Sequence, residues 1–414
     1  MFGRVSKKWR WLATAVATSI ALCAPASAQV KSIKIAAPFG LTGPEGPFAK
    51  PYISALELAI KYINDNGGIR SLGGAPLELL LQDSQSDPKN AVRLLREMKA
   101  QGAVMAVAPF ASGLVLAAKP VLTELDLPII VPSLARQITE DNANKVIWRI
   151  SNIDEAMVND AMTFIDESIK AGDIKVKSIG IVAQAGGAGA PFAKAIEARA
   201  TKMGLSVVNL SYDATQARNF GPIVAQLAQA NVDLVTGFMY TGDALQFAEA
   251  YLLQKWKPSE GFVWMAGAHG EYGFRKALRT DTARWMVAGF AATSGFATTA
   301  SCATMKKFAA DYEANYKEPL AGLVPAAPAT IAVIADALER AASTEPAAIK
   351  KALAATNIDY CGHPLYALAG GVRFNANGDN ERFVPTIIQH EGETDLVSVW
   401  PKSVAARAPV WPAR

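Results

Sequence analysis

The sequence predicts an α/β protein made of two lobes, each a doubly wound parallel sheet. Short apolar strands alternate with amphipathic helices along the chain, which is the pattern of a parallel sheet with helices on both faces. The alternation runs to about residue 150 and then starts again, which indicates a second unit of the same kind. The length of 414 residues is sufficient for two such units.

The first lobe is expected to begin with a strand at Ser32–Ala37, followed by a loop rich in Gly and Pro. Asp87 and Pro88 have the residue types of a helix N-cap and first helical position. Strands are then expected at Leu77–Leu81, Val104–Ala108 and Pro128–Val131, and helices at Ala55–Asn64, from Asp87 to about Gln101, and at Leu114–Leu125.

Hydroxyl groups follow two neighbouring strands of this lobe. Ser112 comes after the strand Val104–Ala108, and Ser133 comes after Pro128–Val131. Parallel strands place both loops at one edge of the sheet, where ligands of open α/β sheets bind. Helix N-termini and hydroxyls suit an anion such as a carboxylate. The alternative for each serine alone is that it caps a helix, as Ser112 could do.

The pattern restarts after Val146–Ile150, which we interpret as a strand that crosses between lobes. Met286–Phe290 is interpreted as a return crossing, and Pro328–Ala341, apolar on all sides, as a buried helix. The remaining helices are expected at Asn152–Lys170, Phe192–Met203, Phe220–Ala230, Asp243–Gln254 and Thr304–Tyr316, and the strands at Ser178–Ala183, Ser206–Leu210, Val232–Gly237, Phe262–Met265, Val372–Phe374 and Phe383–Glu391, the last two joined by a turn at Asn375–Asn380.

Residues 1–28 have the composition of a cleaved secretory signal. A basic region ends at Arg10, and the apolar region Trp11–Ala24 is shorter than the roughly 20 residues that span a bilayer. Ala26-Ser27-Ala28 is a small-residue cleavage site, which predicts a mature start at Gln29. A retained membrane anchor is the alternative. We expect an exported, soluble protein in the periplasm.

Charge and cysteine content exclude several classes of function. Residues 1–28 hold four basic and no acidic residues, so the remainder has 37 Lys and Arg against 37 Asp and Glu, and nucleic-acid binding is not expected. Cys302 and Cys361 remain after cleavage; they form either a disulfide or two buried thiols. His363 lies near Cys361, but no further Cys or His is close in sequence, so no metal site is expected.

Signatures of catalysis are missing from the sequence. It has no nucleophile elbow, paired-histidine metal motif or P-loop, and Gly186–Gly189 is interpreted as a tight turn because it lacks the spacing of a phosphate loop. We therefore expect no enzymatic activity and no cofactor.

The chain resembles the periplasmic solute-binding proteins of ABC importers, in the branched-chain amino acid (Leu/Ile/Val-binding) group. The segments that carry the resemblance are LTGPEG at Leu41–Gly46, ALELAIKYINDNGGI at Ala55–Ile69, QDSQSDPKNAV at Gln82–Val92, the unit from Ala103 to Thr139, NFGPIVAQL at Asn219–Leu227 and VRFNANGD at Val372–Asp379. The resemblance implies the type I periplasmic binding protein fold, with three hinge crossings near Ile147–Ser151, Ala288 and Gly371. The expected domains are a signal peptide at 1–28, lobe I at 29–149 and 288–368, lobe II at 150–287 and 369–400, and a tail at 401–414.

The resemblance also implies ligand-binding residues. Ser112 matches the serine that holds the ligand carboxylate, Ser133 and Ala135 match the second carboxylate-binding segment, and Phe48 matches a wall aromatic. In the second lobe Tyr240 is the best aromatic candidate.

The second lobe departs from the amino-acid pattern at two positions. No aromatic stands at Gly186, and Ala268 falls at or near the acidic position that pairs with a ligand ammonium, so Glu271 is the nearest candidate and Asp243 an alternative. A buried ammonium without a carboxylate partner is costly. The ligand is therefore either an amino acid or another small carboxylate or amide.

The predicted function follows from the resemblance. We expect a monomeric binding component of an ABC uptake transporter that closes on a small-molecule ligand and meets membrane permease subunits. The alternatives are a ligand-sensing module for a membrane receptor and a secreted enzyme on a similar fold.

Overall fold

The computed structural model describes residue 1 and residues 31–43, 45–108, 111–142, 145–185, 189–213, 219–265, 267–270, 272–277, 290–293, 302–391 and 395–411. Apart from Met1, the predicted signal segment lies outside these residues. None of the described helices is long and apolar enough to cross a membrane.

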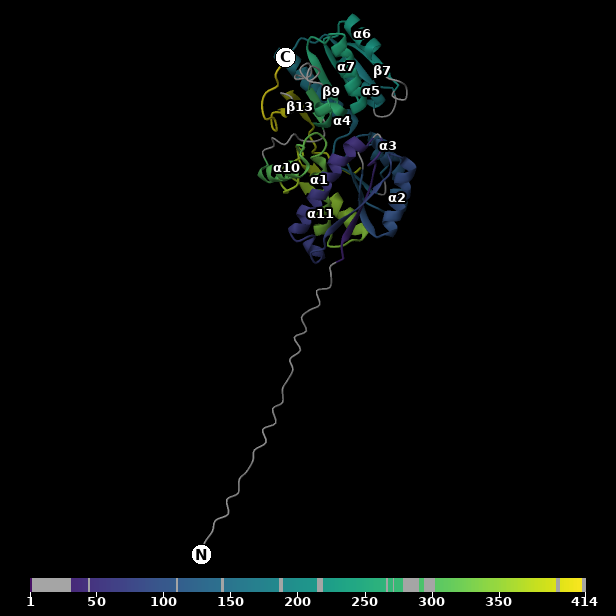
Figure 1. The fold of residues 1–414 in the computed structure, drawn as a ribbon, viewed down its shortest axis with the longest axis vertical. Helices are drawn as coiled ribbons and strands as arrows, with labels where there is room; N and C mark the ends of the chain where they lie inside the picture. The colour runs from purple at the N-terminus through teal and green to yellow at the C-terminus, as the bar shows by residue number, and fades with distance from the viewer. Residues whose placement is uncertain are drawn as a thin grey trace.

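The first lobe is a five-stranded parallel sheet in the order β2-β1-β3-β4-β5, which confirms the predicted fold class for this half. Helices α2 and α3 share one apolar core with the sheet, and α1, α10, α11 and α12 share another, so both faces are covered (Figure 1). The strands are β1 (Ile33–Phe39), β2 (Leu77–Asp83), β3 (Ala103–Val107), β4 (Ile129–Val131) and β5 (Ile147–Arg149), and the helices are α1 (Gly46–Asp65), α2 (Pro88–Ala100), α3 (Ser112–Glu124), α10 (Ala303–Tyr316), α11 (Ala326–Ala341) and α12 (Pro346–Ala354).

The second lobe has a seven-stranded sheet in the order β14-β13-β10-β9-β8-β6-β7. Strands β6 to β10 are parallel, and β13 and β14 add two antiparallel strands at one edge. Helices α4 and α5 pack on one face, and α6, α7 and α8 on the other. The strands are β6 (Ser178–Gln184), β7 (Ser206–Tyr212), β8 (Leu234–Phe238), β9 (Gly261–Met265), β10 (Phe290–Thr293), β13 (Thr386–Glu391) and β14 (Asp395–Trp400), and the helices are α4 (Asp154–Ala171), α5 (Gly189–Lys202), α6 (Gly221–Gln229), α7 (Thr241–Leu253) and α8 (Tyr272–Ala277).

Two local predictions about helices are confirmed. The Asp87 carboxylate accepts hydrogen bonds from the N–H groups of Lys89 and Asn90, so it caps α2 as expected. Helix α11 is buried along nearly its whole length, in agreement with its apolar residues on every side. Helix α1 begins at Gly46 rather than at Ala55. Backbone N–H groups in the first turn of a helix have no partner within the helix, so a proline, which has no N–H, is compatible with this earlier start.

The structure corrects the C-terminal third of the chain. β12 (Val372–Arg373) does not form a hairpin with β13; it pairs with β11 (Asn357–Ile358) in a separate two-stranded sheet. The turn between them exists, but it packs against β5. Gly378 has a φ of +90°, and a Cβ there would lie 2.4 Å from the carbonyl oxygen of Ile147, so the turn needs glycine to approach this strand.

The lobe boundaries differ from the predicted ones. β10 belongs to the larger sheet, so residues 290–293 lie in the second lobe, whereas lobe I was expected to resume at 288. The core of the first lobe extends to Phe383, whereas lobe II was expected to resume at 369. Trp411 of the predicted tail stacks on Phe164 of α4, so the tail packs on the second lobe. The predicted crossing near Ala288 lies outside the described residues.

Cys302 and Cys361 form a disulfide in the first lobe, with their Cα atoms 5.4 Å apart. The bond joins the start of α10 to the segment after β11. Of the two arrangements that the cysteine count allowed, the structure has the disulfide.

Candidate functional site

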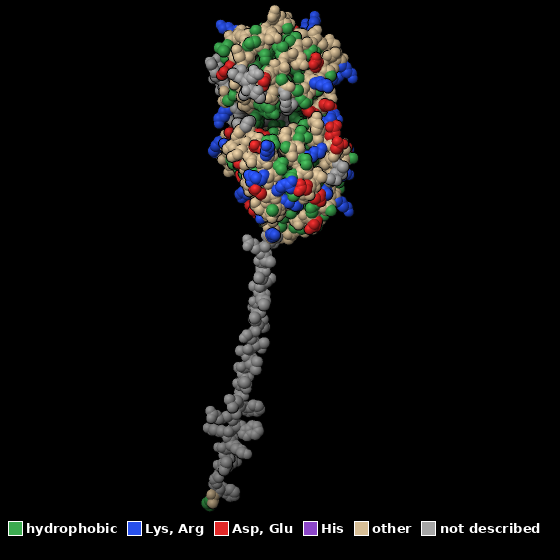
Figure 2. Space-filling model, turned by 90° about the vertical axis from the view of Figure 1, so that its right-hand side faces the viewer, with side chains coloured by type: hydrophobic (Ala, Val, Ile, Leu, Met, Phe, Trp, Pro, Cys, Tyr) green, Lys and Arg blue, Asp and Glu red, His purple; other side chains and the backbone are tan. Residues whose placement is uncertain are grey.

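The two lobes face each other across a cleft. Figure 2 shows a hollow between them, with hydrophobic side chains on its walls. Phe48 of α1 and Tyr240, the residue before α7, meet there edge to face with ring centroids 6.4 Å apart. Tyr240 is 41% exposed, which is high for a tyrosine in ring contact with another lobe. The predicted aromatic pair is thus brought together from opposite lobes.

Ser112 and Ala135 also meet, on the first-lobe wall of the cleft. The N–H of Ala135 donates a hydrogen bond to Ser112 Oγ at 3.2 Å. Ser112 does not cap α3, because the N-cap is Ala111 and makes no side-chain cap bond, so the capping alternative is wrong. The hydroxyl accepts from the neighbouring loop, and among the residues that the structure describes no acceptor takes its own proton.

The loop that carries Ser133 and Ala135 is fixed by contacts on both sides. Ser133 is 1% exposed. The carbonyl of Leu134 accepts from the N–H of Asp154 at the start of α4, and the carbonyl of Pro132 accepts from the hydroxyl of Ser151. One loop of the first lobe is therefore bonded directly to the first helix of the second lobe.

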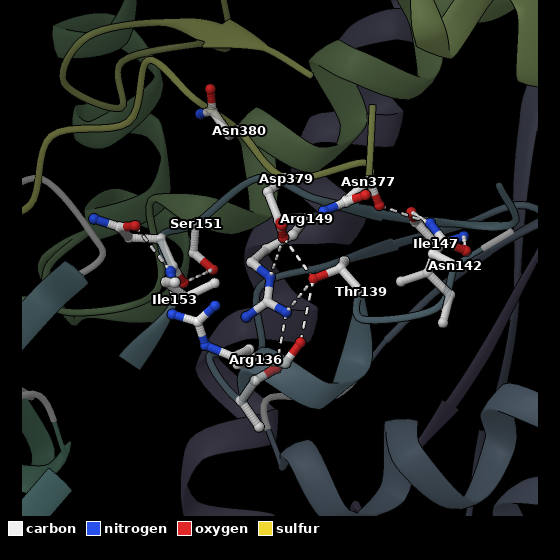
Figure 3. Close-up of polar contacts among 12 residues, drawn as sticks. Arg136, Thr139, Asn142, Ile147, Arg149, Ser151, Ile153, Asn377, Asp379 and Asn380 are labelled. Carbon is white, nitrogen blue, oxygen red and sulfur yellow. Dashed lines mark hydrogen bonds and ion pairs between the residues drawn. The ribbon is translucent and has the colours of Figure 1, made fainter. Parts of the chain in front are cut away.

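A buried arginine lies beneath this loop (Figure 3). Arg149 of β5 is fully buried; its Nη2 donates to the carbonyl of Ala135 at 2.8 Å and to Thr139 Oγ1 at 2.9 Å, and its Nε lies 3.0 Å from Asp379 Oδ1. Thr139 Oγ1 donates to the same carboxylate at 2.7 Å. Burial lowers the pKa of Arg149, and the nearby carboxylates of Asp379 and Asp154 oppose that effect.

The same network joins the first crossing between the lobes to the segment from Gly371 to Asn380. The side-chain amide of Asn380 donates to the carbonyls of Ile150, on the first crossing, and Gly371. The backbone of Arg149 exchanges hydrogen bonds with Gly378 and Asn380. The loop that carries Ala135, the first crossing and the segment from Gly371 to Asn380 are therefore held by one set of polar contacts.

On the second lobe, the surroundings of Tyr240 include a buried acid and a further aromatic ring. Asp243, in the first turn of α7, is 2% exposed and accepts a hydrogen bond from the hydroxyl of Tyr212 at 2.9 Å. Phe238 packs edge to face on Tyr240, with centroids 5.2 Å apart. Glu271 and Gly186 lie outside the described residues, and Ala268 belongs to a short 3₁₀ helix at Gly267–Gly270.

Glu45 is a cleft residue that sequence reasoning missed. It lies directly before α1, three residues from Phe48, and its charge acts on Tyr240 of the other lobe. Burial raises the pKa of its carboxyl to about 7. The sequence signal that could have identified Glu45 is a single acidic residue in an apolar loop rich in Gly and Pro.

Comparison with known proteins gives consistent matches. Residues 32–381 match the family model described as periplasmic binding protein. The Leu/Ile/Val-binding protein homolog 3 of Brucella melitensis biotype 1 is 25% identical over 359 residues, which is 86% of this chain and 90% of that relative.

Solved structures match over a similar extent. The substrate-binding protein LivJ of Streptococcus pneumoniae, in complex with isoleucine, has a TM-score of 0.74 at 19% identity, covering 90% of this chain and 100% of that chain. A solute-binding protein of an ABC transporter from R. palustris, in complex with benzoate, has a TM-score of 0.73 at 18% identity, covering 92% of this chain and 98% of that chain. These structures share the fold of the present chain.

Proposed function

The chain belongs to the periplasmic binding protein family, and from this premise we propose that it captures a small organic acid between its lobes for delivery to an ABC importer. The observation that carries the proposal is the bond between the Ala135 N–H and Ser112 Oγ, which brings together the loops after β3 and β4 at one edge of the first-lobe sheet. Relatives of this chain are named for binding leucine, isoleucine and valine, and a structure of the same fold holds benzoate.

The carboxylate of the solute binds at the first-lobe wall. The hydroxyl of Ser112 and the N-terminal N–H groups of α3, a helix of 13 residues, donate to it, because helix N-termini carry partial positive charge. Ser133 and Ala135 complete this wall. Phe48 and Tyr240 cover the body of the solute from opposite lobes, and Glu271 remains a predicted contact.

Capture proceeds by closure of one lobe on the other. Contacts from both walls stabilise the closed form, since a ligand shifts a conformational equilibrium only through its different affinity for the two states. In this proposal the first lobe consists of residues 31–149 and 302–383, and the second of residues 150–293 and 384–411.

The transport context completes the proposal. The signal at 1–28 directs export, and the mature monomer meets membrane permease subunits. A binding role leaves the solute chemically unchanged, in contrast to an enzymatic one.

The test is a thermal-unfolding screen of the mature protein with amino acids, aromatic and aliphatic acids, and small amides. A ligand of the folded state raises the unfolding midpoint. We expect at least one carboxylate to do so, and chromatography to recover it intact after prolonged incubation. A screen in which no carboxylate shifts the midpoint would contradict the proposal, and conversion of the ligand would indicate an enzyme.

A further inference from the structure

Glu45 has a carboxylate oxygen without a visible partner. Its Oε2 has less than 1 Å² of solvent-accessible surface and no hydrogen-bond partner among the residues that the structure describes. The backbone around it is fixed, because the N–H of Glu45 donates to Ser86 Oγ at 3.2 Å and that hydroxyl donates to the carbonyl of Thr42 at 2.8 Å. The carboxylate packs over the end of β1, where a Cβ on Gly40 would lie 3.0 Å from Oε2.

The neighbouring acid, Asp83, is a carboxylate at the same edge of the sheet whose oxygens accept hydrogen bonds. Asp83, at the end of β2, accepts from the N–H groups of Leu41 and Gln85 and from the hydroxyl of Thr42, at 2.7 to 2.9 Å. These donors hold the pKa of Asp83 below its usual value despite some desolvation. Glu45 has burial without such donors, and leaving a buried acceptor unpaired costs free energy.

The surroundings of Glu45 suit a cation. Phe48 follows it on the first turn of α1, and Tyr240 of the second lobe, whose ring contacts Phe48, lies close enough that the charge of Glu45 adds to the rise in its pKa caused by burial. Aromatic faces attract ammonium groups, and a carboxylate supplies the matching charge. Among the described residues, no Lys or Arg contributes to the environment of this carboxyl, whose pKa shift has burial as its cause.

We propose that Glu45 binds the ammonium group of the captured solute, with Phe48 and Tyr240 against its sides. This assignment depends on the solute-binding function proposed above and makes it more specific. The acid group of the solute lies at the loops after β3 and β4, and its ammonium lies at the loop after β1, the neighbour of β3 in the sheet. The solute is therefore a zwitterion, and the first lobe alone recognises both charges.

The test uses probe pairs that differ only in the ammonium group. We choose leucine with 4-methylpentanoate, phenylalanine with 3-phenylpropanoate, and 5-aminopentanoate with pentanoate, and measure unfolding midpoints with wild type and Glu45→Gln. The ammonium-bearing member of at least one pair should raise the wild-type midpoint while its partner does not, and Glu45→Gln should abolish that shift. Glu57→Gln, which removes an exposed carboxylate from α1, the helix that follows Glu45, should retain it.

The outcomes separate the two proposals. If the simple acids shift the wild type as strongly as the amino acids, or if Glu45→Gln keeps the shift, this assignment is wrong while the binding function stands. If no probe shifts the wild type, both are wrong. A simple acid that binds Glu45→Gln more tightly than wild type identifies the amide as a donor to an anion, which also overturns the assignment.

Two pH measurements provide further checks. Affinity for the ammonium probe should fall about tenfold from pH 8 to pH 6, because protonation of a carboxyl with a pKa of about 7 removes its charge. The titratable groups on the adjoining elements are Asp83, which is already bonded, and Tyr240, whose pKa is raised by burial and then by Glu45. A flat profile between these pH values would contradict the assignment.

The second check needs no ligand. A raised pKa in the folded state means that the folded protein holds the proton more tightly, so stability falls as the pH rises from the unfolded value of 4.5 through about 7. Glu45→Gln lacks this ionisation, so its unfolding midpoint should exceed that of wild type at pH 8 and approach it at pH 4.5. An equal difference at both pH values would show that Glu45 has a partner in the folded protein.

Discussion

The two walls of the cleft hold their acidic groups in different states. Glu45 on the first lobe has an oxygen with no partner among the described residues, whereas Asp243, three residues after Tyr240 on the second lobe, accepts a hydrogen bond from Tyr212. Both lobes have a sheet of mainly parallel strands with helices on both faces, so the difference does not come from topology. It comes from residues at the strand ends and helix starts, and it supports the proposal that the first lobe holds the charged groups of the solute.

Removal of Arg149 should have the largest effect on the stability of the first-lobe wall and on its ligand binding. Arg149→Met removes the donor to the Ala135 carbonyl and the cation beside Asp379, which keeps its hydrogen bond from the Thr139 hydroxyl, and breaking one side of a buried ion pair costs about 3–5 kcal/mol of folding free energy. We expect a lower midpoint of urea unfolding together with weaker ligand binding, because the loop at Ala135 loses its support.

The control is Arg96→Met, which removes an exposed ion pair with Glu124 from the same lobe. Surface pairs contribute at most about 1 kcal/mol, so this variant should unfold close to wild type. Equal midpoints for Arg149→Met and Arg96→Met would show that the network does not stabilise the first-lobe wall.

The sequence predicts the fold more fully than the site. Alternating apolar strands and helices determine the two sheets, because burial on both faces leaves a clear pattern, as in β3 and α11. The pairing of Ser112 with Ala135 was predictable, since both loops follow neighbouring strands of one sheet. Strands as short as β11 and β12 have too few residues to show the hydrophobic pattern that identifies a strand in a sequence.

Other features depend on contacts between distant segments. The bond between Arg149 and Asp379 joins residues far apart in sequence, and nothing local in either segment indicates the partner. Glu45 was missed for a related reason, because its burial results from the packing of the loops after β1 and β2. Lobe boundaries depend on which sheet β10 enters, and its four residues carry no signal of that choice.

Substitution of Ser112 tests the polar wall directly. Ser112→Ala removes the acceptor of the Ala135 N–H and the donor to a carboxylate, so affinity for the acid that gives the largest thermal shift should fall by about 1–3 kcal/mol. Isothermal calorimetry measures the change. Ser343→Ala removes a hydroxyl that accepts a backbone N–H in the same way, from Glu345, and should leave affinity unchanged. Unchanged affinity in Ser112→Ala would assign the hydroxyl a structural role.

Substitution of Tyr240 tests the aromatic wall and should have the smallest effect. Tyr240→Ala removes the edge-to-face contacts with Phe48 and Phe238, and aromatic pairs contribute about 0.5–1.5 kcal/mol beyond their buried area. Because Tyr240 is 41% exposed, its loss should weaken ligand binding, measured by calorimetry, more than it lowers the unfolding midpoint. Tyr240→Phe keeps the ring and should bind like wild type. If Tyr240→Phe binds as weakly as Tyr240→Ala, the hydroxyl recognises the solute, and the second lobe then takes part in polar recognition as the first lobe does.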